Sequence, residues 1–449
     1  MVSITDIAIY YLPIVADRTL SFGAKDVDHI TVVRVALHGR RQTDGVVVTG
    51  WADVPLNIGW AWPQVSFRKG EKNARTIIET LRRYLIGTTS VVDPFFWYRN
   101  VLQPAFHDVL RETKLDVPDL LKTMCIAPFD IAFHDLFGCF YGAKTYDLYN
   151  TAVFTDDLGA VCSSPSEATP SEAARLLSGV FPKDIFVSPP PLRVTAWHLV
   201  GLSDTVGHQS DGTGLMEWVR DDGLTAVKVK LNGGNLDEAI RRLADIRSVL
   251  VDSTVTRLSI DFNGTVLSQH QLLGFIKKIE QDAGPRIAMI EQPFPAPGIE
   301  KLSDEVVEIC RDQGIVLSLD ESVLNLEDVI AARENGWTGV VVKTCKTQTR
   351  SLLIAALARR LSLKVVVQDL TNPMLALIAH LQLAAHLDDG WGAEVNAVQF
   401  YPQASLPESQ VHPEAFRRRG GTVSIESFSG CGLGYRLSEI ARTLPRRAA

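Results

Sequence analysis

The sequence predicts an α/β fold in which an N-terminal α+β domain precedes a parallel β-barrel, and two observations lead to this prediction. From residue 225 to residue 400, short β-branched or apolar runs alternate with amphipathic segments. Before residue 155, strand-like runs are followed by helical patterns without such alternation. Alternating strands and helices build parallel sheets covered on both faces, whereas segregated ones build α+β units. A chain of 449 residues is long enough for both.

The first domain, residues 1–155, is expected to contain an antiparallel sheet and a set of helices. The strand-like runs are Ile4–Leu12, Ile30–Leu37 and Val46–Ala52, and the helical patterns are Glu71–Leu85, Pro104–Glu112 and Ile126–Gly142. Two further segments are predicted as loops, because residues 17–28 hold glycine and charges and residues 51–63 hold three tryptophans. Tryptophans in a loop are either local core or ligand contacts, and both interpretations stay open.

The next segment, residues 156–191, is rich in Ser, Pro, Ala and Asp. This composition indicates a surface insertion or linker that is partly mobile, and no chemistry is assigned to it. The barrel is expected over residues 192–400, from a first strand at Leu192–Val200 to a closing strand at Trp391–Val395. The loop-rich tail, residues 401–449, is expected to return to the first domain.

The other barrel strands are short. They are Thr225–Asn232, Leu258–Asp261, Ile287–Glu291, Ile315–Asp320, Gly339–Lys343 and Lys364–Gln368. The helix Leu236–Leu250 illustrates how the intervening elements begin: Asn235, with Glu238 three residues later, stands directly before an apolar face with helical spacing.

Two lysines in the strand Thr225–Asn232 are the first functional candidates. Alternate residues of a strand project from the same side, so Lys228 and Lys230 share one face. Alone, this pattern is typical of a half-exposed strand. A parallel sheet covered on both faces leaves no solvated side, and a buried ammonium is costly unless it is paired or lines a polar site. We therefore expect both lysines to point into the interior and to serve function.

Three carboxylates, Asp261, Glu291 and Asp320, end successive predicted strands. Their spacing of about 30 residues matches one βα unit, which places them at equivalent heights on the C-terminal face of a barrel. Each of them alone could be a helix-capping acid. Three converging carboxylates repel one another unless a cation joins them, and an all-oxygen set suits Mg²⁺. Because all three acids occur at the same position of successive βα units, a metal site is favoured over three separate helix caps.

Lys343 ends the next strand, and Asp369 follows the strand after that. Lys230 precedes the carboxylate strands around the barrel and Lys343 follows them, so the two lysines are expected to face each other across the metal. A lysine near another lysine and a divalent cation has a lowered pKa, which suits a general base. This arrangement indicates proton transfer.

Composition limits the classes of partner. The formal net charge is −7 and the pI about 5.8, with charges of both signs interspersed, which argues against nucleic acid or an anionic membrane and favours a small molecule. The six cysteines lack metal-ligand spacing, which fits a reducing cytoplasm. We expect neither a secretory leader nor an apolar segment of transmembrane length.

The candidate residues together resemble a known family. The matching motifs are the K-x-K of Lys228 and Lys230, the D-x-N of Asp261 and Asn263, the E-Q-P beginning at Glu291, the D-E-S beginning at Asp320, and Lys343. They resemble the enolase superfamily and, within it, the muconate lactonizing enzyme subgroup. The resemblance covers most of the chain and implies a modified (β/α)8 TIM barrel with a capping domain that the C-terminal tail completes. It also implies that the loops at residues 17–28 and 51–63 lie over the active site, and that the protein is a homo-oligomer.

The resemblance further implies a role for each residue. Asp261, Glu291 and Asp320 would bind Mg²⁺, for which Mn²⁺ can substitute, and Lys230 and Lys343 would be acid/base catalysts on opposite faces of a small carboxylate substrate. Supporting or substrate-binding roles fall to Lys228, Asn263, Glu321 and Asp369. Lys228 is expected to hold a substrate carboxylate oxygen and to keep Lys230 deprotonated. The reaction would remove the proton α to the carboxylate through a metal-stabilised enediolate.

Several outcomes of that shared step stay open. Reprotonation from the other face, or ring closure, would make the enzyme an isomerase of the racemase, epimerase or cycloisomerase type, whereas loss of a β-substituent would make it a dehydratase, a lyase. The sequence lacks the seventh-strand histidine of the mandelate racemase branch, so sugar-acid dehydration is less favoured. A non-catalytic relative that only binds is a weaker alternative, because all three acids and both lysines are present.

Two residues have structural interpretations beside the functional ones. Asp369 could receive a substrate amino group, bond a hydroxyl, or cap the helix that follows Pro373. His198, at the end of the first barrel strand, is more typical of a satisfied buried histidine than of a catalytic participant, although it could line the site.

Overall fold

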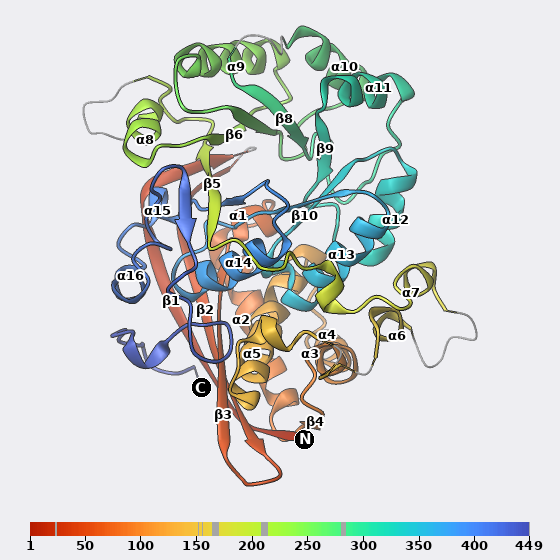
Figure 1. The fold of residues 1–449 in the computed structure, drawn as a ribbon, viewed down its shortest axis with the longest axis vertical. Helices are drawn as coiled ribbons and strands as arrows, with labels where there is room; N and C mark the ends of the chain where they lie inside the picture. Colours follow the sequence, from red (N-terminus) through yellow and green to blue (C-terminus); the bar gives the residue numbers. More distant parts are fainter. Residues whose placement is uncertain are drawn as a thin grey trace.

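At the centre of the larger domain is a closed ring of eight parallel strands (Figure 1). The computed structural model describes residues 1–22, 25–150, 152–154, 156–163, 170–207, 214–279 and 284–448. The strands are β5 (Arg193–Val200), β6 (Ala226–Lys230), β7 (Arg257–Asp261), β8 (Arg286–Glu291), β9 (Val316–Leu319), β10 (Gly339–Val342), β11 (Lys364–Val367) and β12 (Ala393–Glu394). Each pairs with its successor, and β12 pairs with β5 to close the ring. The predicted barrel is confirmed.

Helices surround this barrel and begin where the sequence supplies capping side chains. They are α8 (Leu215–Asp222), α9 (Leu236–Leu250), α10 (Gln269–Lys278), α11 (Asp304–Gln313), α12 (Leu326–Glu334), α13 (Gln348–Arg360) and α14 (Met374–Leu387). Asn235 accepts a hydrogen bond from the backbone N–H of Glu238 at the start of α9, as predicted from the sequence. Ser268 and Ser303 do the same for α10 and α11. The amphipathic helices α9 to α11 turn their apolar faces to the barrel.

The N-terminal domain is an antiparallel sheet packed against helices. Its strands β1 (Val2–Phe22), β2 (Lys25–Arg41), β3 (Val47–Leu56) and β4 (Thr89–Ser90) lie in the order β3-β2-β1-β4. The helices include α2 (Phe67–Leu85), α4 (Gln103–Thr113) and α5 (Asp119–Tyr141). The fold class, an α+β cap beside an eight-stranded barrel, is therefore as the sequence predicts.

The predicted loop at residues 17–28 is wrong for the residues that the structure describes. There β1 continues to Phe22 and β2 begins at Lys25, so the segment is the end of a β-hairpin, with Leu20 paired to Val27 and Phe22 to Lys25. Several residues of this ribbon are exposed, which accounts for the charges that suggested a loop. The second predicted loop, residues 51–63, contains the end of β3 and a one-turn helix, α1 (Ile58–Ala61).

Helix α5 corrects a second expectation, that no apolar segment reaches transmembrane length. Among the described residues, α5 is the one helix long and apolar enough to do so, but 89% of its apolar window is buried inside the protein. It packs directly on β3, where Gly50 makes room: a Cβ atom at Gly50 would lie 2.0 Å from the Ala132 carbonyl oxygen. Burial on all sides explains an apolar helix without a polar face.

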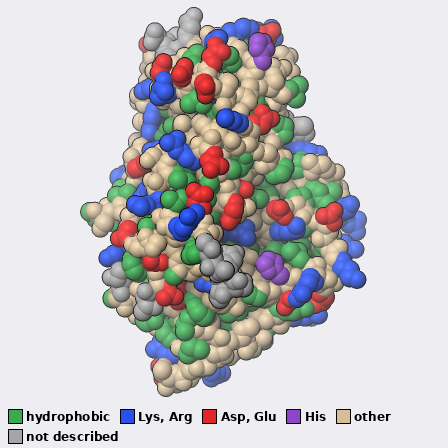
Figure 2. Space-filling model, turned by 90° about the vertical axis from the view of Figure 1, so that its right-hand side faces the viewer, with side chains coloured by type: hydrophobic (Ala, Val, Ile, Leu, Met, Phe, Trp, Pro, Cys, Tyr) green, Lys and Arg blue, Asp and Glu red, His purple; other side chains and the backbone are tan. Residues whose placement is uncertain are grey.

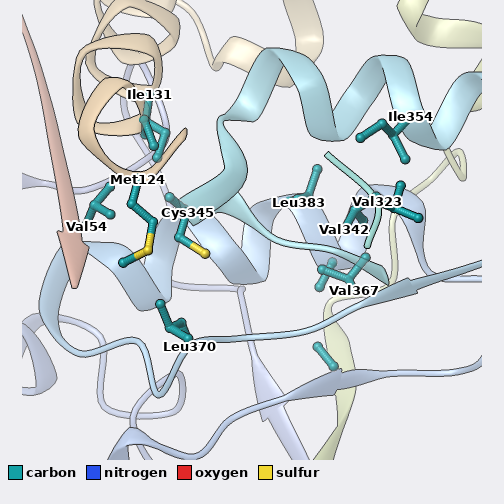
Figure 3. Packing of buried hydrophobic residues seen from close by; sticks show 14 of the residues in the cluster. Val54, Met124, Ile131, Val323, Val342, Cys345, Ile354, Val367, Leu370 and Leu383 are labelled. Carbon is teal, nitrogen blue, oxygen red and sulfur yellow. The ribbon is translucent and has the colours of Figure 1, made fainter. Parts of the chain in front are cut away.

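The cap and the barrel share one hydrophobic core. Figure 3 shows Val54 of β3, Met124 of α5 and Cys345, which follows β10, gathered in the same packing, and all three belong to one continuous cluster of buried residues. Beside this contact, the Asp130 side chain of α5 accepts hydrogen bonds from the N–H and the hydroxyl of Thr349, at 2.8 and 2.7 Å. The cap is thus bonded to the first turn of α13.

The C-terminal tail returns to the first domain, as Figure 1 shows from the position of the chain end beside β1 to β3. Strand β13 (Thr422–Ser424) pairs antiparallel with β5, and the backbone N–H of Ala448 donates to the Ile9 carbonyl at 2.8 Å. Within the segment 156–191, the described residues form α6 (Leu158–Cys162) and α7 (Glu172–Leu176), and Arg360 of α13 donates to the Leu176 carbonyl. This segment is therefore attached to the barrel, although its boundaries as an insertion stay a prediction.

The surface agrees with the mixed charge pattern of the sequence. Figure 2 shows one face of the molecule, on which Lys and Arg side chains are interspersed with Asp and Glu side chains rather than gathered in a patch of one sign.

Asp130 gives a pH-dependent prediction. Burial raises its pKa to about 7, although hydrogen bonds from Thr349 oppose the rise. Between pH 4 and 7 the folded protein therefore keeps a proton that the unfolded chain releases, so this group's contribution to stability falls as pH rises. We expect the Asp130→Asn variant to gain stability relative to the parent across that window, by at most about 1.4 kcal/mol per pH unit. Urea unfolding at about pH 4.5, 5.5 and 6.5 measures the difference, and a difference independent of pH would contradict the prediction.

Candidate active site

The ends of neighbouring strands bring the predicted acids together. Strand pairing sets Lys230 of β6 opposite Asp261 of β7, and Asp261 opposite Glu291 of β8. Asp320 directly follows the last residue of β9. The side chains of all three acids are at most 1% exposed. The structure therefore places the three predicted acids at one end of the barrel and buries them.

Lys228 lies at the centre of this group. Its Nζ donates hydrogen bonds to Glu291 Oε1 at 2.9 Å, Gln368 Oε1 at 3.0 Å and Glu394 Oε1 at 2.7 Å, and it lies 3.0 Å from Asp261 Oδ2. An ammonium has three hydrogens to donate, and these partners use all of them. The lysine points into the interior as expected, but in this geometry it has no donor left for a substrate oxygen.

Lys230 and Lys343 lie on opposite sides of the barrel end. Lys230 ends β6 and Lys343 follows β10, four positions away in a ring of eight strands. Lys230 Nζ lies 2.6 Å from Asp261 Oδ2, and Lys343 Nζ lies 2.8 Å from Asp320 Oδ2. Both lysines line a small cavity of about 40 Å³. Their positions match the prediction that they face each other.

The cap covers both lysines with aromatic rings. Lys230 Nζ lies 5.6 Å from the centre of the Phe22 ring, at the end of β1, and Lys343 Nζ lies 4.9 Å from the Trp60 ring of α1. The Trp60 indole N–H also donates to Glu321 Oε1 at 2.8 Å. Trp60 therefore contacts the site and also belongs to the buried core, so both interpretations of the tryptophans apply to this residue. The segments predicted to lie over the site do reach it.

Glu321 and Asn263 form a bridge between two of the acid loops. The Asn263 side-chain amide donates to Glu321 Oε1 at 3.1 Å, and its backbone N–H donates to Asp261 Oδ1 at 2.8 Å. Asn263 reaches this position with a left-handed backbone, φ 44°, a conformation that asparagine tolerates better than most residues. Among the described residues, the buried Glu321 Oε2 has no hydrogen-bond partner.

Asp369 lines the cavity, and its interpretation as a helix cap is wrong. Helix α14 begins after Pro373, with no side-chain cap. Asp369 Oδ2 instead accepts hydrogen bonds from the backbone N–H groups of Asn372 at 3.3 Å and Asn396 at 3.0 Å. The carboxylate therefore joins the loops that follow β11 and β12. His198 does not line the cavity; it is buried beside Trp218, at 5.6 Å between ring centres.

Three residues of the site were not predicted from the sequence. Glu394 and Gln368 bond Lys228, and the Lys346 ammonium lies 2.9 Å from Asp320 Oδ1 and bonds the Val323 carbonyl. Gln368 and Glu394 fall in or beside the predicted seventh and eighth strands, so the strand phase that identified the other acids could have found them. Lys346 ends a single 3-10 turn after Lys343, where strand periodicity gives no signal.

The electrostatic balance of the site is dominated by neighbouring charges. Burial opposes the ionised form of Asp320, but the ammoniums of Lys343 and Lys346 outweigh it and hold the pKa at about 2. Lys228 and Lys230 likewise hold the pKa of Asp261 well below its usual value, against the effect of burial. Burial and the adjacent Asp261 raise the pKa of Glu291 well above its usual range.

The lowering of the lysine pKa is expected beside a divalent cation; the protein's own groups alone act on Lys343 in the opposite direction. Burial lowers its pKa, but Asp320 and the further acids Glu394 and Glu291 more than compensate, so the pKa is raised above its ordinary value. The acids outnumber the lysines: six carboxylates (Asp261, Glu291, Asp320, Glu321, Asp369 and Glu394) surround four ammoniums (Lys228, Lys230, Lys343 and Lys346). The ammoniums therefore do not fully offset the repulsion among the acids, in agreement with the raised pKa of Glu291.

These residues fit a divalent cation by their chemistry and charge. In the part of the chain that the structure describes, no three His, Cys, Asp or Glu side chains are grouped closely enough to hold a metal ion, because lysine ammoniums lie among the acids. The donor set nevertheless consists of buried carboxylate oxygens, which Mg²⁺ prefers, and a cation among them would offset the repulsion that raises the pKa of Glu291.

The chain is similar to known proteins in sequence over its C-terminal half and in structure over nearly its whole length. A family model described as "Enolase C-terminal domain-like" matches residues 214–441, a range that includes all nine predicted site residues. Among curated proteins, none matches the sequence significantly. Solved structures match over nearly the whole chain.

Three of these structures illustrate the similarity. The 2-chloromuconate cycloisomerase of Rhodococcus opacus 1CP is 20% identical with a TM-score of 0.64, covering 98% of this chain and 100% of that one. The muconate lactonizing enzyme of Pseudomonas fluorescens is 16% identical, with a TM-score of 0.64 and coverage of 98% and 99%. The dipeptide epimerase of Enterococcus faecalis V583 is 14% identical, with a TM-score of 0.63 and coverage of 96% and 99%. At these identities the structures establish the shared fold.

Lys346 supplies a prediction for the site. Replacing Lys346 with Met keeps most of the side-chain volume but removes an ammonium that bonds a buried carboxylate, an interaction that contributes about 1.5–3 kcal/mol. We expect Lys346→Met to lose free energy of unfolding in that range, as measured by urea denaturation at pH 7. The matched control, Lys277→Met, breaks the exposed ion pair with Glu305 and should cost less than about 1 kcal/mol. Equal losses in both variants would contradict the assignment.

Proposed function

The chain belongs to the enolase C-terminal domain-like family, and thus to the enolase superfamily, and from this premise we propose that it is a metal-dependent enzyme that removes the proton α to a substrate carboxylate. The observation that carries the proposal is the placement of Lys230 and Lys343, four strands apart in the ring, on one cavity with three buried carboxylates between them. Proton removal on one face and return on the other requires two groups in this relation.

Lys230 and Lys343 are the proposed acid/base pair. Each ammonium contacts one acid of the central set, Lys230 at Asp261 and Lys343 at Asp320, so each Nζ is held at the edge of the cavity. A substrate α-carbon between them would give its proton to one lysine and receive a proton from the other. The product is then a racemised or epimerised acid. Loss of a β-substituent would require departure of a leaving group after the same first step. Cyclisation would run that elimination in reverse: a substrate oxygen adds to the β-carbon of an unsaturated acid, and one lysine then protonates the α-carbon.

Asp261, Glu291 and Asp320 are the proposed ligands of Mg²⁺, with Mn²⁺ as a substitute. When bound, the ion supplies stabilisation of the negative charge that develops on the substrate carboxylate. The dipeptide epimerases of Enterococcus faecalis V583 and Cytophaga hutchinsonii, similar in fold, are complexed with Mg. Because all three hydrogens of Lys228 are engaged, we assign it to balancing the charge of the acids rather than to the substrate.

The lining of the cavity supports a small carboxylate with an apolar part as the substrate. Besides the lysines and acids, it is lined by the apolar residues Leu20, Phe22, Trp60, Leu199 and Leu370. The apolar residues come largely from the cap, so the cap encloses the part of the substrate that does not react. Water is thereby excluded from the proton that is transferred.

The acid/base assignment is tested by hydrogen exchange. A panel of acyl amino acids, dipeptides and hydroxy acids, each as separate enantiomers or epimers, is incubated in heavy water with Mg²⁺ and analysed by mass spectrometry. We expect Lys230→Ala to abolish incorporation of deuterium into one stereoisomer and Lys343→Ala into the other, each by about 10²–10⁴-fold, because one base serves each face. Both variants lose interconversion.

The matched control is Lys277→Ala, which removes an exposed lysine far from the cavity and should exchange like the parent. Exchange that neither site substitution affects would contradict the two-base assignment. Binding of Mg²⁺ without exchange of any α-hydrogen across the panel would instead favour a non-catalytic binding protein.

The metal assignment is tested by thermal unfolding with and without Mg²⁺. A ligand at about 100 times its dissociation constant stabilises a folded protein by about 2.7 kcal/mol, so the unfolding temperature of the parent should rise. Asp261→Asn and Glu291→Gln should each suppress the rise, whereas Glu305→Gln at the surface should keep it. A rise that persists in both site variants would place the ion elsewhere.

A further inference from the structure

Two cysteines far apart in the sequence meet at the junction of the cap and the C-terminal tail. Cys139 lies in the last turn of α5, and Cys431 lies 292 residues later in the tail. Their Sγ atoms are 2.7 Å apart. Unbonded heavy atoms of this size normally stay farther apart, since even two carbon atoms prefer about 3.5–4.0 Å.

The backbone around both residues fixes this approach. The Gly432 N–H donates to the Ala143 carbonyl at 2.9 Å, and the Thr145 N–H donates to the Gly432 carbonyl at 2.8 Å. A Cβ atom at Gly138 would lie 2.6 Å from the Gly432 Cα, so the helix and the tail touch at the residues next to the two cysteines. The thiols are therefore brought together by the chain path and not by a choice of side-chain conformation alone.

The tail is also bonded to the side chain of Asp135, one turn before Cys139 in α5. Its carboxylate accepts the Leu433 N–H at 2.7 Å and the Trp51 N–H of β3 at 2.9 Å. Helix, strand and tail thus meet at this acid. A covalent bond at the cysteines would reinforce a contact that hydrogen bonds already define.

The pair is open to reagents from solution. Cys431 is exposed and Cys139 is partly exposed, whereas Cys125, Cys310 and Cys345 are buried. Reaction with a disulfide reagent begins at the more accessible thiol. Cys431 is therefore the entry point and Cys139 the resolving thiol.

We propose that Cys139 and Cys431 form a redox-active dithiol that closes to a disulfide and fastens the C-terminal tail to α5, a property independent of the proposed reaction. The oxidant is a low-molecular-weight disulfide. The Cys431 thiolate attacks one of its sulfurs and releases one thiol; the Cys139 thiolate then attacks Cys431 Sγ and releases the second. One protein disulfide forms, the reagent is reduced to two thiols, and the two protons of the cysteines pass to them.

The length of the loop that the disulfide would close explains why it would stabilise the protein. A disulfide stabilises mainly by restricting the unfolded chain, more so for long loops, and this one would enclose almost two thirds of the protein. The folded protein would change little, because the two sulfur atoms already lie side by side.

The test uses oxidised glutathione on the folded full-length protein. We expect the parent to lose two hydrogen atoms by intact mass, to give a linked peptide pair containing Cys139 and Cys431 after proteolysis, and to unfold at a higher temperature than the protein reduced with dithiothreitol. Cys139→Ser should instead keep one glutathione on Cys431, and Cys431→Ser should show no change in unfolding temperature on oxidation.

The matched control is Cys162→Ser, which removes a partly exposed cysteine outside the pair and should close as the parent does. A parent that retains glutathione on Cys431, or remains fully reduced, would overturn the proposal. A disulfide that forms but leaves the unfolding temperature unchanged would contradict the proposal that it fastens the tail to α5. Because Cys431 is exposed, its serine variant is expected to fold, so a failure of Cys139→Ser to fold would not remove the test.

Discussion

The burial of charge at the C-terminal end of the barrel is the constraint on which the rest of the structure depends. Ionised groups removed from water are costly unless each has a partner of opposite sign. Lys228 meets this requirement with three acids, and Lys343 and Lys346 meet it at Asp320. Parallel pairing makes this possible, since the strand ends present their side chains at one level. The register of β6, β7 and β8 is therefore an electrostatic requirement as well as a packing one.

The same charges raise the pKa of Lys343 when the protein's own groups alone act on it. Surrounding acids raise its pKa, whereas proton removal requires a neutral amine. The excess of acids over lysines that causes this rise is also what attracts a divalent cation. An acid that is shared with such a cation raises the pKa of its lysine less, so the repulsion among the acids and the demand for a neutral amine are relieved together. The ten charges are better understood as one coupled set than as separate pairs.

Strand phase explains what could be predicted from the sequence. Lys230, Asp261, Glu291 and Asp320 fall at the ends of strands spaced by one βα unit, and a parallel sheet turns that spacing into proximity. Lys346 was not predicted as a site residue, because it lies in a 3-10 turn and such a turn has no periodic pattern in the sequence. The hairpin at residues 17–22 and 25–28 was predicted as a loop because of its charged residues. The full length of α5 was not predicted, because the polar residues Asp130, His134 and Asp135 interrupt its apolar pattern. Each of these side chains forms a hydrogen bond with a residue distant in sequence.

The cap is more than a cover for the barrel, because it positions part of the chemistry. The turn that carries Lys343 and Lys346 leads into α13 at Thr349, which Asp130 of α5 bonds through both the backbone and the hydroxyl. On the other side, Trp60 holds Glu321 and covers Lys343. A displacement of the cap would therefore move Lys343, Glu321 and the ring of Trp60 together. Since α5 shares its core with β3 and with the barrel, the position of Lys343 depends on the packing of both domains and not on its own strand alone.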